Sequence, residues 1–153
     1  HLVFSTLHTN DAPSAVTRLV DMGLEPFLVA STVEGLMAQR LVRRICKSCR
    51  MEVAVHGAPL EEVIPEDIKA YHRGKGCDEC RGTGYKGRQG VFELVVVDDP
   101  VREMILRRDG ANRIKKYCVE HGMRTLRDHA WDCVRQGVTT PDEVVRITKA
   151  DKF

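Results

Sequence analysis

The apolar positions in the first part of the chain change their spacing, and each spacing predicts a different element. Residues 2–6 (LVFST) form a continuous apolar and β-branched run, which predicts a buried strand. Apolar residues then recur every three or four positions, so a helix is expected over residues 10–22, started by Asn10 or Asp11. Gly23 follows in the position where helices commonly end.

The next segment is apolar on most of its helical circumference. Residues 26–39 (PFLVASTVEGLMAQ) therefore predict a second helix, buried against a sheet. Residues 40–45 (RLVRRI) predict a strand that leads into the first pair of cysteines. Residues 59–74 (PLEEVIPEDIKAYHRG) are less periodic and predict one or two short amphipathic helices. The six glycines within residues 74–90 predict turns.

The last third of the chain is regular again. Residues 91–97 (VFELVVV) predict a strand. Helices are expected over residues 98–108, 111–122, 123–137 and 139–148. Thr140, Pro141 and Glu143 predict the start of the last helix, as a capping box with proline at the first helical position.

Composition restricts the class of protein. The 153 residues include 24 Lys and Arg against 22 Asp and Glu and only 5% aromatic residues, so no nucleic-acid partner is expected. No run approaches the roughly 18 apolar residues of a membrane span, so we expect one soluble domain or two small ones. The chain does not start with methionine, and no turn precedes its first strand-like run. We therefore expect a fragment of a larger protein, from which a signal peptide could have been lost.

Four of the six cysteines occur as two C-x-x-C pairs, CKSC and CDEC, with 27 residues between the pairs. Two such pairs on tight loops can present four thiolates to zinc in a tetrahedron. We expect a structural ion, because four protein ligands leave no position open for catalysis. Its ligands would be Cys46, Cys49, Cys77 and Cys80. The alternatives are two unrelated pairs of reduced thiols, or a thioredoxin-like redox motif, which favours a single pair at the start of a helix.

The remaining cysteines and two of the histidines have simpler interpretations. Cys118 and Cys133 fall within helical patterns and are expected to be small buried hydrophobic residues. His56 and His72 lie between the two cysteine pairs and are expected to be ordinary surface histidines. None of these four residues is therefore predicted to bind the metal.

Two further histidines, His1 and His8, flank the first predicted strand. Side chains alternate between the faces of a strand, so residues an odd distance apart point to opposite sides and cannot share a ligand on a straight strand. A turn after residues 2–6 would bring His8 to the carboxyl end of the strand, where open α/β sheets bind ligands.

Longer stretches resemble one family. The chain resembles the carboxyl-terminal part of the ATPases that drive type II secretion and type IV pilus assembly, in the ordered stretches HLVFSTLHTNDA, RLVDMGLEPF, AQRLVRRIC, GCDECRGTGYKGRQGVFEL and GMRTL with GVTT. The resemblance implies an α/β fold in which residues 1–45 are the distal part of a RecA-like P-loop ATPase core. Residues 46–90 would be a zinc-binding subdomain, and residues 91–153 a strand followed by a helical C-terminal region.

The resemblance also implies a function for the parent protein. Members of the family are hexameric cytoplasmic motors, peripheral at the inner membrane, that use ATP and Mg²⁺ and act with an inner-membrane platform protein and cytoplasmic adaptor proteins. The stretch HLVFSTLHT resembles the family's histidine box, in which His1 and His8 would sense the nucleotide phosphates. No G-x-x-x-x-G-K-[ST] motif occurs in the chain, so the fragment alone is expected to be an inactive part of an ATPase.

Secretion, pilus extension and pilus retraction are alternatives within the family. The resemblance favours the first two, because a tetracysteine pattern is typical of secretion and assembly motors and not of retraction motors. Residues 31–46 (STVEGLMAQRLVRRIC) and 90–99 (GVFELVVVDD) favour type II secretion, with type IV pilus assembly as the alternative.

Two interpretations outside the family concern the cysteine region. The stretch CDECRGTG also matches the C-x-x-C-x-G-x-G motif of Hsp40-type zinc domains, but that module carries four such motifs, and CKSCRMEV lacks the glycines. A basic run would suit a nucleic-acid zinc ribbon. The same run could instead face a nucleotide interface, a neighbouring subunit or an anionic lipid surface. Its members are Arg40, Arg43, Arg44, Lys47 and Arg50.

Overall fold

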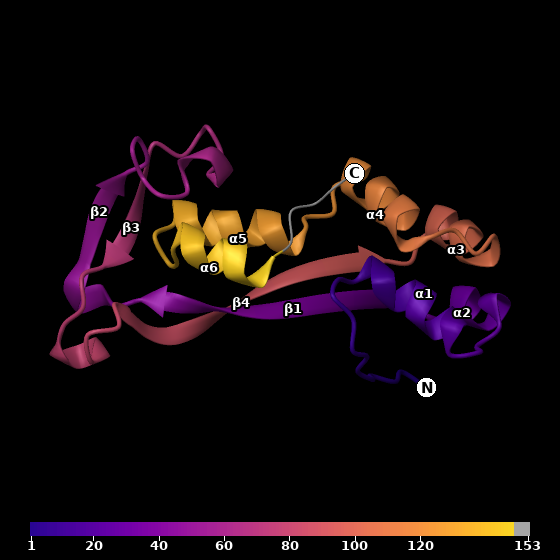
Figure 1. Ribbon diagram of the computed structural model, residues 1–153. Coiled ribbons are helices and arrows are strands. Elements are labelled where there is room, and N and C mark those ends of the chain that lie inside the picture. The colour runs from indigo at the N-terminus through magenta and orange to yellow at the C-terminus, as the bar shows by residue number, and fades with distance from the viewer. Residues whose placement is uncertain (149–153) are drawn as a thin grey trace. The chain divides into compact units, whose positions relative to one another are not determined.

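A computed structural model describes residues 1–148, and the chain divides into two units. The first unit is built from residues 1–39 and 92–125. Among the described residues, the second is built from residues 40–91 and 126–148. Each unit therefore combines two separate stretches of sequence, and each is described below by itself, with the element labels of Figure 1.

The first helix of the first unit is the one that the sequence predicts. Helix α1 spans Pro13–Asp21, within the predicted range. The side chain of Asp11 accepts a hydrogen bond from the backbone N–H of Ser14 over 3.0 Å, which satisfies one of the free donors at the helix start. Gly23 follows the helix with a φ of +92°, a left-handed conformation that glycine adopts without steric cost.

The predicted helix over residues 26–39 is wrong in its second half. Helix α2 spans only Pro26–Thr32, and strand β1 (Gly35–Ile45) begins three residues later. The side chain of Phe27 is 58% exposed, so α2 is not enclosed on all sides as its composition suggested. An apolar run without clear periodicity fits either element, and here pairing with a second strand decides for β. The predicted strand over residues 40–45 is confirmed as the second half of β1.

Strand β4 (Tyr85–Val96) contains most of the predicted strand over residues 91–97 but starts six residues earlier. Its first half falls in the glycine-rich run that was predicted to form turns. Strands β1 and β4 pair as a two-stranded antiparallel sheet, visible in Figure 1, and this pairing gives the glycine-rich backbone its hydrogen-bond partners. Each of the two strands contributes residues to both units.

The predicted strand over residues 2–6 is also wrong. Residues 1–9 form neither helix nor strand, and Leu2, Val3 and Phe4 are 79%, 77% and 89% exposed. A strand requires a neighbouring strand to pair its backbone groups. Within residues 1–148 the two sheets are β1 with β4 and β2 with β3, and neither includes this run.

The first unit is completed by two of the predicted C-terminal helices, α3 (Asp99–Leu106) and α4 (Ala111–Glu120). Helix α1 packs against α4, and α2 packs against α3. Glu93 of β4 is buried and accepts a hydrogen bond from the backbone N–H of Ala12, which ties the start of α1 to the sheet. The apolar core of this unit includes Val16, Val29, Ala30, Val95, Val101, Ile105, Ile114 and Cys118.

The second unit contains a short antiparallel ribbon where the sequence predicted amphipathic helices. Strands β2 (Arg50–Ala54) and β3 (Ala70–Gly74) pair with Glu52 opposite His72. The helices predicted over residues 59–74 are wrong: this range contains a 3-10 turn at Glu61–Val63 and then strand β3. The segment is short, and it must return the chain to lie beside β2.

The other elements of the second unit are the last two predicted helices, α5 (Leu126–Arg135) and α6 (Pro141–Ile147), which pack against each other. Their apolar faces, together with β1 and β4, supply the core residues Val42, Ile45, Val91, Leu126, Ala130, Trp131, Val134 and Val144. Across residues 1–148, no helix combines the length and the apolar character needed to cross a membrane.

Candidate metal centre

Two paired ribbons bring the four C-x-x-C cysteines together. The first cysteine loop (residues 46–49) directly follows β1, and the second cysteine loop (residues 77–84) directly precedes β4. The ribbon of β2 and β3 connects the far ends of the two loops. Because β1 pairs with β4 and β2 with β3, both loops lie at the same place in the unit. These two strand pairings bring together cysteines that are far apart in sequence.

The spacing of the sulfur atoms fits one tetrahedral ion. All four Sγ atoms lie within 4.8 Å of one another. The Sγ–Sγ distance is 3.8 Å for Cys46 and Cys77, 3.8 Å for Cys49 and Cys80, and 3.7 Å for Cys77 and Cys80. Four sulfurs at ~2.3 Å from a zinc ion occupy the corners of a tetrahedron with edges of about 3.8 Å. A disulfide would need ~2.05 Å, and the cysteines are all free.

Backbone groups of the second cysteine loop point at one sulfur. The N–H groups of Cys77 and Gly84 each donate to Sγ of Cys80 over 3.2 Å. Gly84 has a φ of +77°, and a Cβ on it would lie 2.7 Å from the carbonyl oxygen of Gly74. Glycine is therefore required at this position, because two backbone segments approach each other directly.

Burial and hydrogen bonding give the cluster thiols different pKa values. Burial raises the pKa of Cys80, but the backbone donors Cys77 and Gly84 outweigh this effect and lower it to about 6. Burial raises the pKa of Cys49 to about 11. All four thiols would lose their protons on binding a metal, and the backbone N–H groups of Cys77 and Gly84 favour the ionised form at Cys80.

The other two cysteines play no part in the cluster. Cys118 lies on α4 and Cys133 on α5, and both are buried, which confirms their prediction as small core residues. Burial raises the pKa of both thiols, to about 11 for Cys118, with Asp98 and Glu93 adding to the effect there. Neither thiol is prepared for ionisation or for reaction at neutral pH.

In the structure, neither His1 nor His8 belongs to the cysteine cluster. His1 and His8 are exposed on residues 1–9. Among the described residues, the only cluster of three or more His, Cys, Asp or Glu side chains close enough to hold a metal is the four-cysteine cluster. His56 is 98% exposed and is the surface histidine that was expected, whereas His72 on β3 is only 27% exposed.

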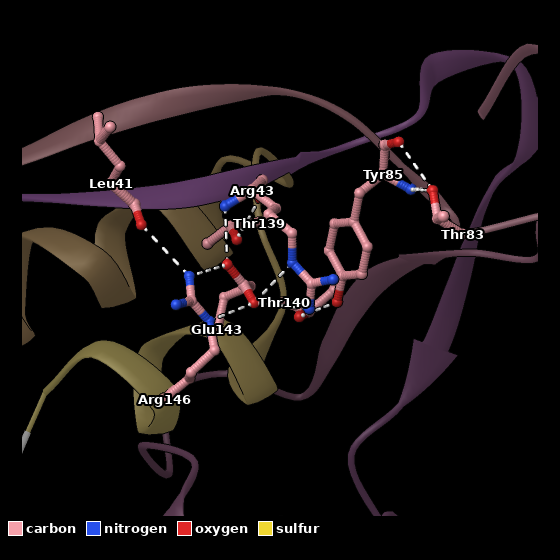
Figure 2. A network of polar contacts seen from close by, with 8 residues as sticks. All are labelled: Leu41, Arg43, Thr83, Tyr85, Thr139, Thr140, Glu143 and Arg146. Carbon is pink, nitrogen blue, oxygen red and sulfur yellow. Dashed lines mark hydrogen bonds and ion pairs between the residues drawn. The ribbon is translucent and has the colours of Figure 1, made fainter. Parts of the chain in front are cut away.

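A polar network beside the cysteine loops was not predicted from the sequence (Figure 2). Its centre is Glu143, a completely buried carboxylate on α6. Arg43 of β1 donates to it from its backbone N–H over 2.8 Å and from Nε over 2.9 Å. Arg146 donates from Nε over 2.8 Å and from Nη2 over 2.7 Å. The charge of the carboxylate is thus balanced by two guanidinium groups.

The predicted capping box at the start of α6 is therefore wrong, although the helix starts where it was predicted. Thr140 is the N-cap residue and Pro141 opens the helix, but the hydroxyl of Thr140 makes no capping hydrogen bond. It bonds instead with the hydroxyl of Tyr85 over 2.8 Å, and Glu143 turns to the arginines. The helix start is encoded locally, whereas the partners of these two side chains come from distant β1 and β4.

Three members of the basic run take one of two roles. Arg43 is used inside the second unit, with its guanidinium carbon 4.1 Å from the ring centroid of Tyr85. Arg44 and Lys47 line a hollow of about 360 Å³ beside the cysteine loops. Lys86 and Arg88 of β4 line the same hollow, together with Glu79, which pairs with Lys86 over 3.1 Å.

The fold and the site together define the chain as an α/β protein with a tetrahedral cluster of four cysteines. Its fold matches the crystal structure titled as the pilus retraction motor PilT with bound ADP, with a TM-score of 0.61 and 20% identity. That match covers 99% of this chain and 33% of the other. Residues 1–146 match the model of the family described as "Type II/IV secretion system protein". The chain belongs to this family.

Curated relatives in the family carry two kinds of name. The chain is 44% identical to the type IV pilus assembly ATPase PilB of Thermus thermophilus, over 97% of this chain and 17% of that protein. It is also 44% identical to the type II secretion system protein E of Pseudomonas aeruginosa, over 99% of this chain and 30% of that protein. Identity to the type IV pilus assembly ATPase TfpB of Acinetobacter baylyi is 39%, over 96% and 26% respectively. The chain thus spans less than a third of the length of these relatives.

Proposed function

We propose that the chain is the C-terminal portion of a hexameric cytoplasmic ATPase that powers type II protein secretion by assembling a pseudopilus. The observation that carries this proposal is the family match over residues 1–146. Type IV pilus assembly is the second candidate, because relatives of both kinds are 44% identical to the chain. The two functions share one physical task, which is to convert ATP hydrolysis into movement of a membrane-embedded partner.

The proposal keeps the division of the chain that the family resemblance implies. In this proposal, residues 1–45 are the distal part of a RecA-like core, residues 46–90 the zinc subdomain, and residues 91–153 a strand and a helical C-terminal region. His1 and His8 would sense the nucleotide phosphates, since they lie exposed and free of helix or strand. The phosphate-binding loop is not among these 153 residues, so ATP and Mg²⁺ would bind chiefly to other parts of the protein.

The four-cysteine cluster would hold a structural Zn²⁺ ion. Support comes from the donor set, four thiols, and from sulfur separations of 3.7 and 3.8 Å that match the edges of a zinc tetrahedron. When bound, the ion would supply folding energy to loops that have little apolar core of their own. The four protein ligands are Cys46, Cys49, Cys77 and Cys80, and they leave no position for a catalytic water.

The basic hollow offers a contact for an anionic lipid surface. Four cations line it, and Lys86 and Arg88 lie on the exposed start of β4. Each basic residue near an anionic leaflet contributes about 1 kcal/mol of attraction. This contact would hold the motor at the inner membrane, beside the platform and adaptor proteins of the machine. Co-sedimentation with anionic vesicles should weaken in the double variant with Lys86→Glu and Arg88→Glu. It should not weaken in the control variant Lys116→Glu on α4. Equal binding by wild type and both variants would refute the lipid contact.

Two measurements on purified protein test the main proposal. Elemental mass spectrometry should find close to one zinc per chain. A polypeptide of residues 1–153 should show no measurable ATP binding, whereas the longer protein that includes the phosphate-binding loop should bind and hydrolyse ATP. Tight ATP binding by residues 1–153 would place the nucleotide site within these residues and contradict the proposal. Deletion of the gene then separates the candidates, because loss of protein secretion or loss of pili identifies the machine.

A further inference from the structure

We propose that a clasp, formed by residues 137–140 and Glu143, positions the cysteine loops, so that retention of the metal depends on the segment that opens helix α6. This inference rests on the proposed ligation of zinc by the four cysteines. The clasp residues lie nearly a hundred positions from Cys46 in sequence, and none of them is a metal ligand. Their contacts reach the chain next to both cysteine loops, as described below.

The first contact is with the end of strand β1. The backbone N–H of Ile45 donates to the carbonyl of Val138 over 2.8 Å. The hydroxyl of Thr139, which is completely buried, donates to the carbonyl of Arg43 over 2.8 Å. The clasp thus pairs with the last residues of β1 immediately before Cys46, and it fixes the direction in which the first cysteine loop leaves the strand.

The second contact anchors the clasp itself. Glu143 accepts hydrogen bonds from the backbone and the guanidinium of Arg43 and from the guanidinium of Arg146 (Figure 2). Displacing the clasp would separate this buried carboxylate from the backbone N–H and the guanidinium of Arg43 and leave it only Arg146 on its own helix, which is unfavourable. The position of β1 at Arg43 and the start of α6 are therefore fixed to each other.

The third contact is with the second cysteine loop. Tyr85 follows Gly84 directly, and its hydroxyl bonds with that of Thr140 over 2.8 Å. The guanidinium of Arg43 lies over the Tyr85 ring, which joins this contact to the carboxylate network. Gly84 in turn accepts a hydrogen bond from the N–H of Cys46 over 2.9 Å, so the two loops and the clasp form a closed set of contacts.

The fourth contact is with the β2–β3 ribbon. Gly137 has a φ of +66°, and a Cβ on it would overlap the guanidinium of Arg50 and lie 2.8 Å from Nδ1 of His72. Arg50 directly follows Cys49, and His72 lies on β3, the strand that leads to the second cysteine loop. The clasp therefore contacts the chain on both sides of the first loop and on both sides of the second.

The alternative is a clasp that stabilises only the packing of α5 and α6. In that case, weakening it would lower the stability of these helices and leave the affinity for metal unchanged. A clasp that positions the ligands would instead change metal retention, because supporting residues of a metal site commonly alter its affinity by 10–100-fold. The two roles differ in a measurable quantity that does not involve ATP hydrolysis.

The test measures release of zinc from the purified protein into an excess of a chromophoric chelator. The Glu143→Gln variant keeps the shape of the side chain and removes its charge, and it should release zinc about tenfold faster than wild type. Thr139→Val, a substitution of nearly equal volume, should accelerate release to a smaller extent. Glu120→Gln is the matched control, because it removes an exposed acid that pairs with Lys116 on α4, and it should not change the rate.

Wild-type release rates in both clasp variants would overturn the inference, even if their melting temperatures fell. Should Glu143→Gln fail to fold, the rate in Thr139→Val decides alone. Hydrogen exchange on wild-type protein gives an independent reading: chelation should raise amide exchange in residues 126–147 and leave residues 111–120 unchanged. Unchanged exchange in residues 126–147 would also overturn the clasp. A wild-type protein that contains no zinc would instead refute the proposed metal centre, and the clasp with it.

Discussion

Arg43 binds the carboxylate of Glu143 through both its backbone N–H and its guanidinium group. The backbone N–H donates to Oε2 over 2.8 Å, and Nε and Nη2 donate to Oε1 over 2.9 and 2.8 Å. A hundred residues separate the two partners in sequence. Such a buried carboxylate is tolerated only where hydrogen-bond donors and opposite charge surround it. This pair therefore fixes how β1 meets α6 within the second unit.

The first prediction concerns stability. Glu143→Gln should reduce the free energy of unfolding by about 3 kcal/mol, because it leaves two arginines beside a neutral amide that cannot balance their charge. Urea-induced unfolding followed by circular dichroism measures the loss. Glu120→Gln, which alters an exposed pair on α4, should leave the unfolding curve in place. Equal midpoints for the two variants would contradict the role given to the buried pair.

The second prediction concerns pH. Burial raises the pKa of Glu143, but hydrogen bonds from Arg146 and Arg43 outweigh this and lower it from 4.5 to about 2. A carboxyl group whose pKa is lower in the folded state stabilises the protein fully above its unfolded pKa. That stability, about 3 kcal/mol here, is lost as the pH falls from about 5 toward 2.

The pH dependence is measured by comparing wild type with Glu143→Gln, because both proteins carry the same four cluster thiols and the protonation of these thiols cancels in the comparison. The unfolding free energy of wild type should fall more steeply between pH 5 and pH 2.5 than that of Glu143→Gln. Parallel curves for the two proteins would show that Glu143 is not the titrating group responsible.

The third prediction separates steric crowding from backbone strain. Gly82 and Gly84 have φ values of +76° and +77°, so alanine at either position carries the same strain of about 1 kcal/mol. A Cβ at Gly82 has nothing within 4 Å, whereas one at Gly84 would press on the backbone of Gly74. Gly84→Ala should therefore weaken zinc binding far more than Gly82→Ala, as measured by competition with a chelator. Similar losses would mean that φ alone decides.

The fourth prediction concerns the metal ligands. Replacing Cys46 and Cys77 by serine should release the zinc and unfold the cysteine region, because binding energy at a structural site is folding energy. Elemental analysis and a thermal melt of the variant measure the two effects. A protein that keeps its melting temperature after complete removal of the metal would show that the cluster does not stabilise the fold.

The fifth prediction concerns thiol reactivity. Chelation of zinc should make four of the six cysteines reactive toward an alkylating reagent, and mass spectrometry of peptides should identify them. Cys118 and Cys133 should stay unmodified in the folded protein, because burial raises their pKa values and excludes the reagent. Modification of either residue at the rate of the cluster thiols would contradict their assignment to the core.

Several features follow from the sequence alone because their causes are local. Helix α1 is flanked by Asp11 and Gly23, and α6 starts at Pro141, so short-range hydrogen bonds and backbone preferences suffice to predict them. The two C-x-x-C pairs also predict a cluster of four thiols, since this spacing places two sulfurs on each tight loop.

Other features depended on the tertiary structure because their partners are far away in sequence. Residues 35–39 and 85–90 are strands only because β1 and β4 pair, and the exposed run at residues 2–6 is not a strand because, within residues 1–148, it pairs with neither sheet. Glu143 follows a capping-box pattern, yet two arginines compete successfully for its carboxylate. Local sequence specifies which backbone conformations are favourable, but pairing of strands and burial of charge are settled by residues that meet only in the folded chain.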